Sequence, residues 1–536
     1  MSTRCADPVH DQSGPTTYWT RVNVQEAIPG VLTPLGWSLW REAEVAGRRS
    51  FCMMGVLPRC RLAEPGSADE MLMTTFFGRA ALNVDFMRHV GDLTPGSSGD
   101  AVEEQYFGSV RSGVPTTTTN RRLPFVASRL PPLLLLEPRR LHRLLDEQRN
   151  WWRANTLPGA GQQRDGGGLL REARDRFALA SRHHAFGTMF ASLAFNQLSK
   201  LAQAAGEPGL ETQLATGYGG LEEFALVADL WAVSRGEIVM AEFLAQHGFH
   251  GPDEGQLQSR SWREDPSPVE ALAVTYRSLD DTESPAAAAA GRAQIRLAGE
   301  RTVLAGVPRA KRAQARVTLR MARSFVPLRE VGKAAFLMAI DVARVASQAR
   351  GRELVELCVL DDPDDVYFLT VDELLASHHG ELRSVVAERR ARHERYVGLS
   401  LPRVWTGQPS PMEVEPSTEP LPSESAVLKG ISITPGVVEA IARVAEDFNA
   451  ALYLQPGEVL VCRTTDPSWA PVFPIAGALV IDVGGPMSHG AIVARELGTP
   501  CVIGTGTAIR DVPDGALVRV DAGSGSVEVL SVPGEA

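Results

Sequence analysis

The chain has 536 residues, of which 44% are hydrophobic, 22% charged and 6% aromatic. These fractions are typical of globular proteins and exclude wholesale disorder, collagen and a continuous coiled coil, while the length predicts several domains. With 64 acidic and 54 basic residues the formal charge is −10, so neither nucleic acid nor an anionic membrane surface is an expected partner.

Several features of the sequence predict a soluble, cytoplasmic protein. Residues 1–16 are polar, lack the apolar segment of a signal peptide and are expected to form a disordered tail. The leucine run Leu133–Leu136 is far shorter than the ~20 residues of a membrane-spanning helix.

Six cysteines are scattered without a CxxC pair, and no HExxH motif occurs, so we predict reduced thiols and no metal site.

Residues 17–405 are predicted to form one large, mainly α-helical domain. Pro327 is expected to divide one long helical stretch in two. A short strand is predicted at Val366–Thr370, followed by a return to helical pattern over Val371–Arg395. Apolar residues recur at three- and four-residue spacing in the stretches Leu141–Trp152, Leu169–Ala204, Leu221–His247 and Lys311–Arg350.

A change of composition predicts a linker over residues 406–425, which contain five prolines and four glutamates. Such a segment could span roughly 60 Å when extended, either as a swinging arm or as an ordinary spacer, and its composition favours the spacer. Residues 426–536 are predicted to form a small α/β domain with a helix from Ser488 to Leu497 ended by Gly498. Its expected strands are Val459–Arg463, Ala478–Val483, Cys501–Ile503 and Ala516–Asp521.

The sharpest local pattern is a glycine-rich turn that leads into this helix. Gly484 and Gly485 permit a sharp turn, Ser488 is suited to cap the helix, and His489 follows in its first turn. Free backbone N–H groups and the positive end of the helix dipole favour an anion at that point. They also favour a neutral, nucleophilic imidazole, so His489 could hold a phosphoryl group.

The segment from Lys429 to Val529 resembles the phosphohistidine swivelling domain of the phosphoenolpyruvate-utilising enzyme family. By this resemblance His489 carries the phosphoryl group and Gly484, Gly485 and Ser488 bind it. Two positions depart from the family pattern, because Met487 stands where threonine is frequent and Gly490 where alanine is commoner. The matching residues continue through Ala491–Pro500, Val502-Ile503-Gly504, Asp514-Gly515 and Val520-Asp521.

The upstream region resembles the acceptor-binding domain of rifampicin phosphotransferase and phenylphosphate synthase-like proteins. The residues that carry this resemblance are Trp19–Asn23, Pro29-Gly30-Val31, Thr33-Pro34, Gly78-Arg79 with Asn83, Gly248–Pro252 with Glu254, Ser261–Asp265, and Arg329-Glu330 with Lys333.

Candidate acceptor-site residues follow from this second resemblance. Arg329 and Lys333 are four residues apart on one helical face, where two cations could clamp a transferring phosphoryl group, while Glu330 could accept a hydroxyl proton. His250 suits a general base or a substrate contact, although the family more often has arginine nearby. Arg263 could be a further phosphate clamp or a plain surface cation. The His183-His184 and His378-His379 pairs are expected to be surface or packing residues.

The family resemblance also predicts how the phosphoryl group arrives. Relatives of this type carry an ATP-grasp domain, which finds no counterpart in the sequence, and no GxxxxGK[ST] motif occurs. We therefore expect a separate ATP-grasp subunit to phosphorylate His489 from Mg-ATP, with no cofactor bound tightly by this chain. The predicted acceptor is a small phenolic or benzylic alcohol; a rifamycin-like antibiotic is the alternative substrate, and a non-catalytic ligand- or kinase-binding regulator is the alternative class.

Overall fold

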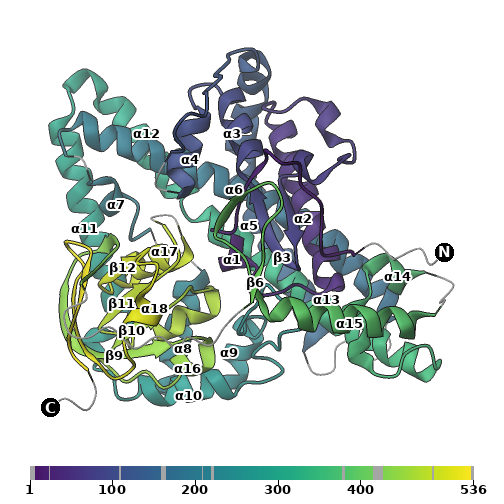
Figure 1. The fold of residues 1–536 in the computed structure, drawn as a ribbon. Helices are drawn as coiled ribbons and strands as arrows, with labels where there is room; N and C mark the ends of the chain where they lie inside the picture. The colour runs from purple at the N-terminus through teal and green to yellow at the C-terminus, as the bar shows by residue number, and fades with distance from the viewer. Residues whose placement is uncertain are drawn as a thin grey trace. The chain divides into compact units, whose positions relative to one another are not determined.

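The computed structural model describes residues 7–22, 24–107, 110–157, 165–207, 209–218, 222–376, 381–413, 427–485 and 488–532 (Figure 1). Contacts divide the chain into two compact units. Unit 1 comprises residues 1–186, 255–259 and 332–417, and unit 2 comprises residues 187–254, 260–331 and 418–536. Among the described helices, none is both long enough and apolar enough to cross a membrane.

Unit 1 is mainly helical and contains a small antiparallel sheet. The sheet has the order β2 (Met73–Phe76), β3 (Arg79–Asn83), β1 (Tyr18–Thr20), β5 (Val404–Thr406). Its helices are α1 (Val24–Ala27), α2 (Pro34–Met53), α3 (Val84–Leu93), α4 (Gly99–Phe107), α5 (Leu123–Thr156), the first half of α6 (Gly166–Ala204), most of α13 (Leu328–Glu356), α14 (Val371–Leu375) and α15 (Leu382–Val397); a strand pair, β4 (Leu399–Ser400) and β6 (Met412–Glu413), completes it.

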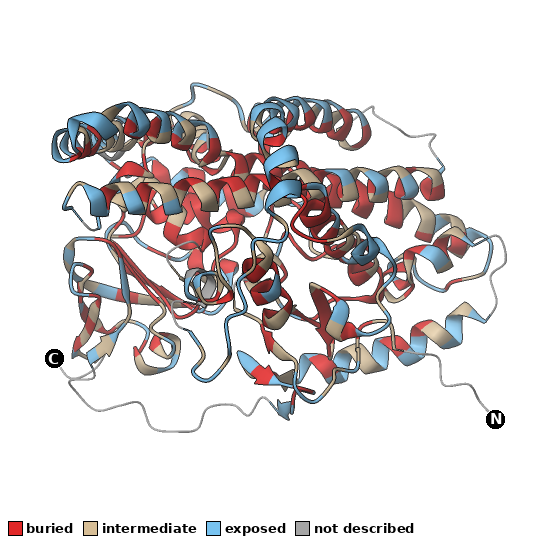
Figure 2. Cartoon of the chain, turned by 90° about the horizontal axis from the view of Figure 1, so that it is seen from above, coloured by how far each residue is buried: buried red, intermediate tan, exposed pale blue. Residues whose placement is uncertain are grey.

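Helix α5 begins well before the predicted helical stretch Leu141–Trp152 and runs through Pro131, Pro132 and Pro138. Two arginines anchor its first turns. Arg122 donates to the carbonyl oxygens of Gly55 and Leu57 at 2.9 and 3.0 Å, and Arg129 donates to the carbonyl of Cys52 at 3.0 Å. These tertiary bonds offset the main-chain hydrogen bonds that proline removes. The buried residues of α5 recur at three- and four-residue spacing and so share one side of the helix. Figure 2 shows helices on which buried and exposed residues lie on opposite sides in this way.

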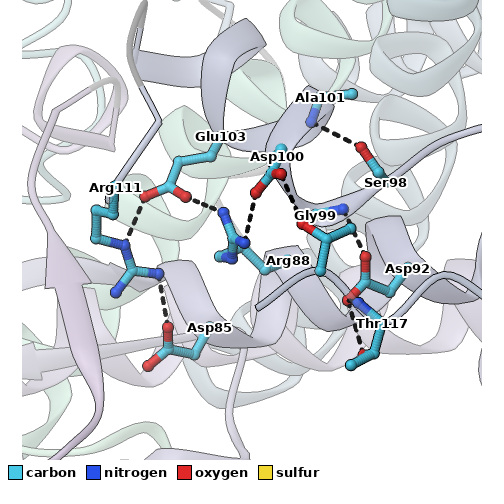
Figure 3. A network of polar contacts seen from close by, with 11 residues as sticks. Asp85, Arg88, Asp92, Ser98, Gly99, Asp100, Ala101, Glu103, Arg111 and Thr117 are labelled. Atoms are coloured by element: carbon cyan, nitrogen blue, oxygen red, sulfur yellow. Dashed lines mark hydrogen bonds and ion pairs between the residues drawn. The ribbon is translucent and has the colours of Figure 1, made fainter. Parts of the chain in front are cut away.

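A polar network joins α3 and α4 to the segment that follows them (Figure 3). The buried Arg88 of α3 donates to Asp100 at 2.6 Å and to Glu103. Arg111 donates to Glu103 at 2.6 Å and to Asp85 at 2.7 Å. The buried charges of Arg88 and Glu103 are thus paired, and the more exposed Asp85 and Asp100 complete the network, so we interpret it as a structural clamp.

Two local predictions for unit 1 are wrong. Residues 7–16 do not form a loose tail, because the Ser13 amide donates to Gln408 at 2.9 Å and the Gly14 amide to Asp69 at 3.0 Å. Residues 363–368 form a 3₁₀ helix, η5 (Pro363–Phe368), in place of the strand predicted at 366–370. The capping box of Asp362 and Asp365 explains this difference, since it stabilises a helical turn over the strand tendency of the valine and aromatic residues.

Unit 2 begins with helices that agree with the predicted helical stretches. Pro327 separates α12 (Arg312–Phe325) from α13, as predicted. The helices of this part are the second half of α6, α7 (Glu211–Leu214), α8 (Glu222–Ser234), α9 (Met240–His247), α10 (Ser267–Tyr276), α11 (Pro285–Gly306), α12 and the first residues of α13.

The C-terminal part of unit 2 is an α/β domain built on one sheet. The sheet has the order β7-β14-β13-β9-β10-β11-β12-β8, and β9 to β12 are parallel. All four predicted strands and the helix are confirmed. The elements are β7 (Val427–Lys429), β8 (Ile431–Thr434), β9 (Val437–Ala445), α16 (Phe448–Ala451), β10 (Val459–Cys462), η6 (Pro467–Val472), β11 (Ala478–Ile481), α17 (His489–Leu497), β12 (Cys501–Ile503), α18 (Ala508–Asp511), β13 (Leu517–Asp521) and β14 (Ser526–Ser531).

Alternate residues of the parallel strands enter two different cores, because successive side chains of a strand point to opposite faces. Val459 and Val461 pack with residues of β13, β14 and α18, whereas Leu460 packs with residues of α8, α10, η6 and α17. We call this second core the docking face, since it joins the sheet to the preceding helices of unit 2. The Tyr276 hydroxyl donates to the Pro471 carbonyl at 2.6 Å within it. The predicted fold class, a large mainly helical region followed by a small α/β domain, is confirmed.

Candidate functional site

The loop between β11 and α17 presents His489 as the sequence suggests. Gly484 has a φ of +148°, and a Cβ atom there would lie 2.4 Å from Ile503 Cδ1, so glycine is required. The Ser488 hydroxyl accepts from the Ala491 amide at 3.4 Å and caps α17. A Cβ atom added at Gly485 would meet no other atom within 4 Å. His489 is the first residue of α17 and its side chain is only 1% exposed.

The departure at Gly490 has a packing explanation. A Cβ atom at this position would lie 2.7 Å from Thr465 Oγ1 and 2.9 Å from Ile481 Cδ1. Contacts this short require the neighbouring side chains to shift. Met487, the other departure, lies outside the described residues.

Two buried glutamates meet His489. Its Nε2 atom lies 3.5 Å from Glu223 Oε1, and one ligand atom from each of Glu223, Glu330 and His489 falls within 4.8 Å of the others. Each of these residues lies in the first turn of a helix, namely α8, α13 and α17. The positive ends of three helix dipoles therefore surround one point, which favours negative charge there. We call these three residues the His489 cluster.

A pocket adjoins the His489 cluster, since Glu330 is part of its lining. Arg329 and Glu330 line it from α13, and their Nε and Oε1 atoms are 3.5 Å apart. Most of the remaining lining is apolar, as expected of a small-molecule pocket with a few orienting polar groups. The other lining residues are Ala191, Phe195, Ala215, Thr216, Val326, Ile492, Arg495 and Glu496.

Two charged residues of α17, the buried Arg495 and the half-buried Glu496, line this pocket. Burial lowers the pKa of Arg495 to about 10, and its Nε atom donates no hydrogen bond to a residue that the structure describes. Burial raises the pKa of Glu496 to about 7, although its carboxylate accepts from the Gly217 amide at 3.0 and 3.1 Å. The pocket wall therefore carries two guanidinium groups and two carboxyl groups amid apolar side chains.

His250 belongs to a second buried cluster. Its Nδ1 atom lies 2.6 Å from Glu254 Oε2, and both side chains are at most 3% exposed. Asp466, which follows β10, accepts from the Asp253 amide at 3.2 Å. Burial and the nearby charge of Glu254 raise the pKa of Asp466 to about 8. We call His250, Glu254 and Asp466 the His250 cluster.

The remaining predicted site residues take different positions. Lys333 is buried one turn beyond Arg329 on α13 and falls in unit 1. Arg263 has its Nη2 atom 3.8 Å from Glu264 Oε1. Within the described residues, the lining of the pocket includes neither of them, nor His250. His183 contacts Glu137 at 2.7 Å rather than lying without a partner, and His378-His379 fall outside the described residues.

Sequence reasoning missed Glu223, Arg495 and Asp466. Glu223 lies in a plain Glu-Glu pair at the start of α8, where no motif marks it. Asp466 precedes a proline in a loop, a pattern typical of any helix cap. Arg495 could have been found from the sequence, because it lies in the segment Ala491–Pro500, which matches the swivelling domain of the family.

Comparison with known families confirms this resemblance. Residues 454–525 match the PEP-utilising enzyme mobile domain, and residues 184–330 match the rifampicin phosphotransferase fourth domain. The second match coincides closely with the helical part of unit 2, which spans 187–331 apart from residues 255–259. Both parts of the unit that holds the His489 cluster are therefore similar to domains of the phosphoenolpyruvate-utilising enzymes and of rifampicin phosphotransferase.

Individual relatives agree with this assignment. The chain is 34% identical over 304 residues to an uncharacterised protein of Mycobacterium tuberculosis, and this match covers 55% of the chain and 32% of that protein. It is 37% identical over 221 residues to rifampicin phosphotransferase of a Streptomyces species, and this match covers 40% of the chain and 25% of that protein. It is 34% identical over 210 residues to rifampicin phosphotransferase of Bacillus subtilis, and this match covers 39% of the chain and 24% of that protein. The chain thus matches between a quarter and a third of the length of these relatives.

Proposed function

We propose that this chain is a phosphotransferase subunit that carries a phosphoryl group on His489 and delivers it to the hydroxyl of a small organic acceptor. The observation that carries the proposal is the position of His489, at the first turn of α17 beside a pocket lined by Arg329 and Glu330. The domain matches and the phosphotransferase names of the relatives support the same class of reaction.

The chain's own residues can perform the transfer step. The P–N bond to His489 breaks while a P–O bond forms to the acceptor, and the imidazole leaves. Arg329 is suited to neutralise charge on the transferring group, and Glu330 to take the hydroxyl proton and deliver it to the departing imidazole nitrogen, so that His489 becomes neutral again. Backbone N–H groups at the start of α17 hold the phosphoryl oxygens in the loaded state. Lys333 is proposed as a second cation and Arg263 as a further phosphate contact.

The pocket supports a compact, mainly apolar acceptor. Phe195, Val326 and Ile492 supply apolar surface, and Arg329, Glu330, Arg495 and Glu496 supply charged groups. A phenolic or benzylic alcohol fits this division, with its ring against the apolar lining and its hydroxyl toward Glu330. A rifamycin is the second candidate acceptor, favoured by the names of several relatives. A non-catalytic regulator is the remaining alternative.

We further propose that the phosphoryl group comes from Mg-ATP through a separate ATP-grasp subunit, which would hold the magnesium and the nucleotide. The side chain of His489 is 1% exposed when it faces Glu223. Loading from any external donor therefore requires the α/β domain to leave the docking face, a movement of the kind that gates many enzymes. His250 is proposed to contact substrate only after such a movement, since it is buried here.

Transfer can be tested separately from loading. The chain is phosphorylated first and then mixed with a panel of phenols, benzylic alcohols and a rifamycin, and loss of the phosphoryl group is followed by mass spectrometry. Arg329→Ala should load normally but transfer at least 100-fold more slowly, as expected for loss of one charge-stabilising contact. Arg323→Ala, an exposed arginine paired with Glu300, is the matched control and should transfer like the wild type. Equal transfer by both variants would contradict the proposal.

A further inference from the structure

The His489 cluster has the geometry of a metal site. Its three ligand atoms lie within 4.8 Å of one another, and all three side chains are buried. The 3.5 Å between His489 Nε2 and Glu223 Oε1 is close to the separation of about 3.4 Å expected for two ligands placed 2.0–2.2 Å from one tetrahedral ion. Small rotamer adjustments of Glu330 would bring in the third ligand.

The charges of the cluster also favour a cation. Two carboxylates share a buried space with one imidazole, and Arg329, whose Nε atom lies 3.5 Å from Glu330 Oε1, sets one positive charge against their two negative charges. The Oε2 atom of Glu223 is enclosed and accepts no hydrogen bond from any described residue. A buried carboxylate oxygen without a partner is costly, and a metal ion would supply the missing contact.

The ligand set indicates the class of ion. One imidazole nitrogen and two carboxylate oxygens suit Zn²⁺ and the neighbouring transition metals better than Mg²⁺ or Ca²⁺, which prefer oxygen ligands alone. Three protein ligands leave a further coordination position for water or an acceptor. We infer that Glu223, Glu330 and His489 form a binding site for one Zn²⁺-class ion when His489 carries no phosphoryl group.

The site has a regulatory consequence, which rests on the proposed function. A metal ion and a phosphoryl group cannot both occupy the Nε2 atom of His489. Bound Zn²⁺ therefore holds His489 against Glu223 and Glu330 and prevents its phosphorylation, while phosphorylation excludes the ion.

The test measures metal binding by the full chain without nucleotide, donor subunit or acceptor, so its result does not depend on the proposed function. The chain is freed of metal with a chelator and titrated with Zn²⁺ by calorimetry, and with Co²⁺, whose visible absorption reports a low-coordinate site. We expect one ion per chain, a higher melting temperature with Zn²⁺, and an intense Co²⁺ spectrum. Glu223→Gln and Glu330→Gln should each weaken binding at least 10-fold, and His489→Ala should abolish the spectrum.

Glu222→Gln is the matched control, because Glu222 neighbours Glu223 on α8 but lies outside the cluster. It should bind Zn²⁺ like the wild type. The inference is overturned if Zn²⁺ fails to bind, or if the stoichiometry and affinity are the same in Glu223→Gln, Glu330→Gln and the wild type, which would indicate adventitious surface binding. Glutamine preserves side-chain shape, and circular dichroism of each variant excludes loss of folding as the cause.

Discussion

At the scale of single residues, the turn before α17 depends on one glycine and not on its neighbour. Gly484→Ala should lower the free energy of unfolding by about 1–3 kcal/mol, because the added methyl group meets Ile503 and a positive φ is unfavourable for alanine. Urea denaturation measures this difference. Gly485→Ala should change the value by less than about 0.5 kcal/mol, since nothing lies within 4 Å of its Cβ position. Equal losses in the two variants would argue against this loop geometry.

The residues that a short sequence pattern identifies by itself are those whose role is local, whereas Glu330 is identified only through the family resemblance. The turn, the cap and the histidine of the β11–α17 loop lie within six residues of one another, so a short motif reveals them. Glu223 and Glu330 reach the same histidine from α8 and α13, over distances in sequence that no pattern encodes. Proximity of this kind is a product of tertiary packing, and it could not be read from the chain before folding.

At the scale of elements, the loop between β10 and η6 should make stability depend on pH. The pKa of Asp466 is raised to about 8 in the folded protein, against about 3.9 in an unfolded chain. Between these values the folded state binds more protons, so stability falls as pH rises toward 8. The contribution of this one carboxyl reaches at most about 1.4 kcal/mol per pH unit.

Asp466→Asn tests that dependence. Denaturation at several pH values from 5 to 8 should show a shallower decline in the variant than in the wild type, since an amide does not titrate. The neighbouring titratable groups Asp253, Glu254 and His250 are present in both proteins, so the difference in slope measures the removal of Asp466 together with its coupling to these groups. A decline of the same slope in both proteins would mean that Asp466 is ionised throughout this range.

Elements were predictable where local propensity and packing agree. The strands β10 to β13 are short apolar runs between glycine and proline residues, and α17 ends at Gly498 with a φ of +82°, so each has its own start and stop signals. The predictions failed where another interaction prevailed. A capping box formed η5 in place of a strand, and arginine contacts with the end of α2 accompany the continuation of α5 through its prolines.

Across the whole molecule, phosphorylation of His489 should compete with packing of the α/β domain on the docking face. Tyr276→Phe removes the buried hydrogen bond to the Pro471 carbonyl, which weakens docking by about 1 kcal/mol. Phosphorylation of His489 by the donor should then become several-fold faster, because the α/β domain leaves more often. Rapid-quench kinetics measures the rate. Tyr453→Phe, on an exposed tyrosine of the same domain, should have no effect, and a slower or unchanged rate in Tyr276→Phe would contradict the opening step.

Phosphorylation of His489 can be detected by the intact mass of the chain. The purified chain is incubated with Mg-ATP, with and without a candidate ATP-grasp partner, alongside His489→Ala. We expect the mass to rise by one acid-labile phosphoryl group only when the partner is present, and to stay unchanged in the variant. If the wild-type chain gains no phosphoryl group with any ATP-grasp partner, or if His489→Ala gains one equally, His489 is not the carrier and the phosphotransferase account is wrong.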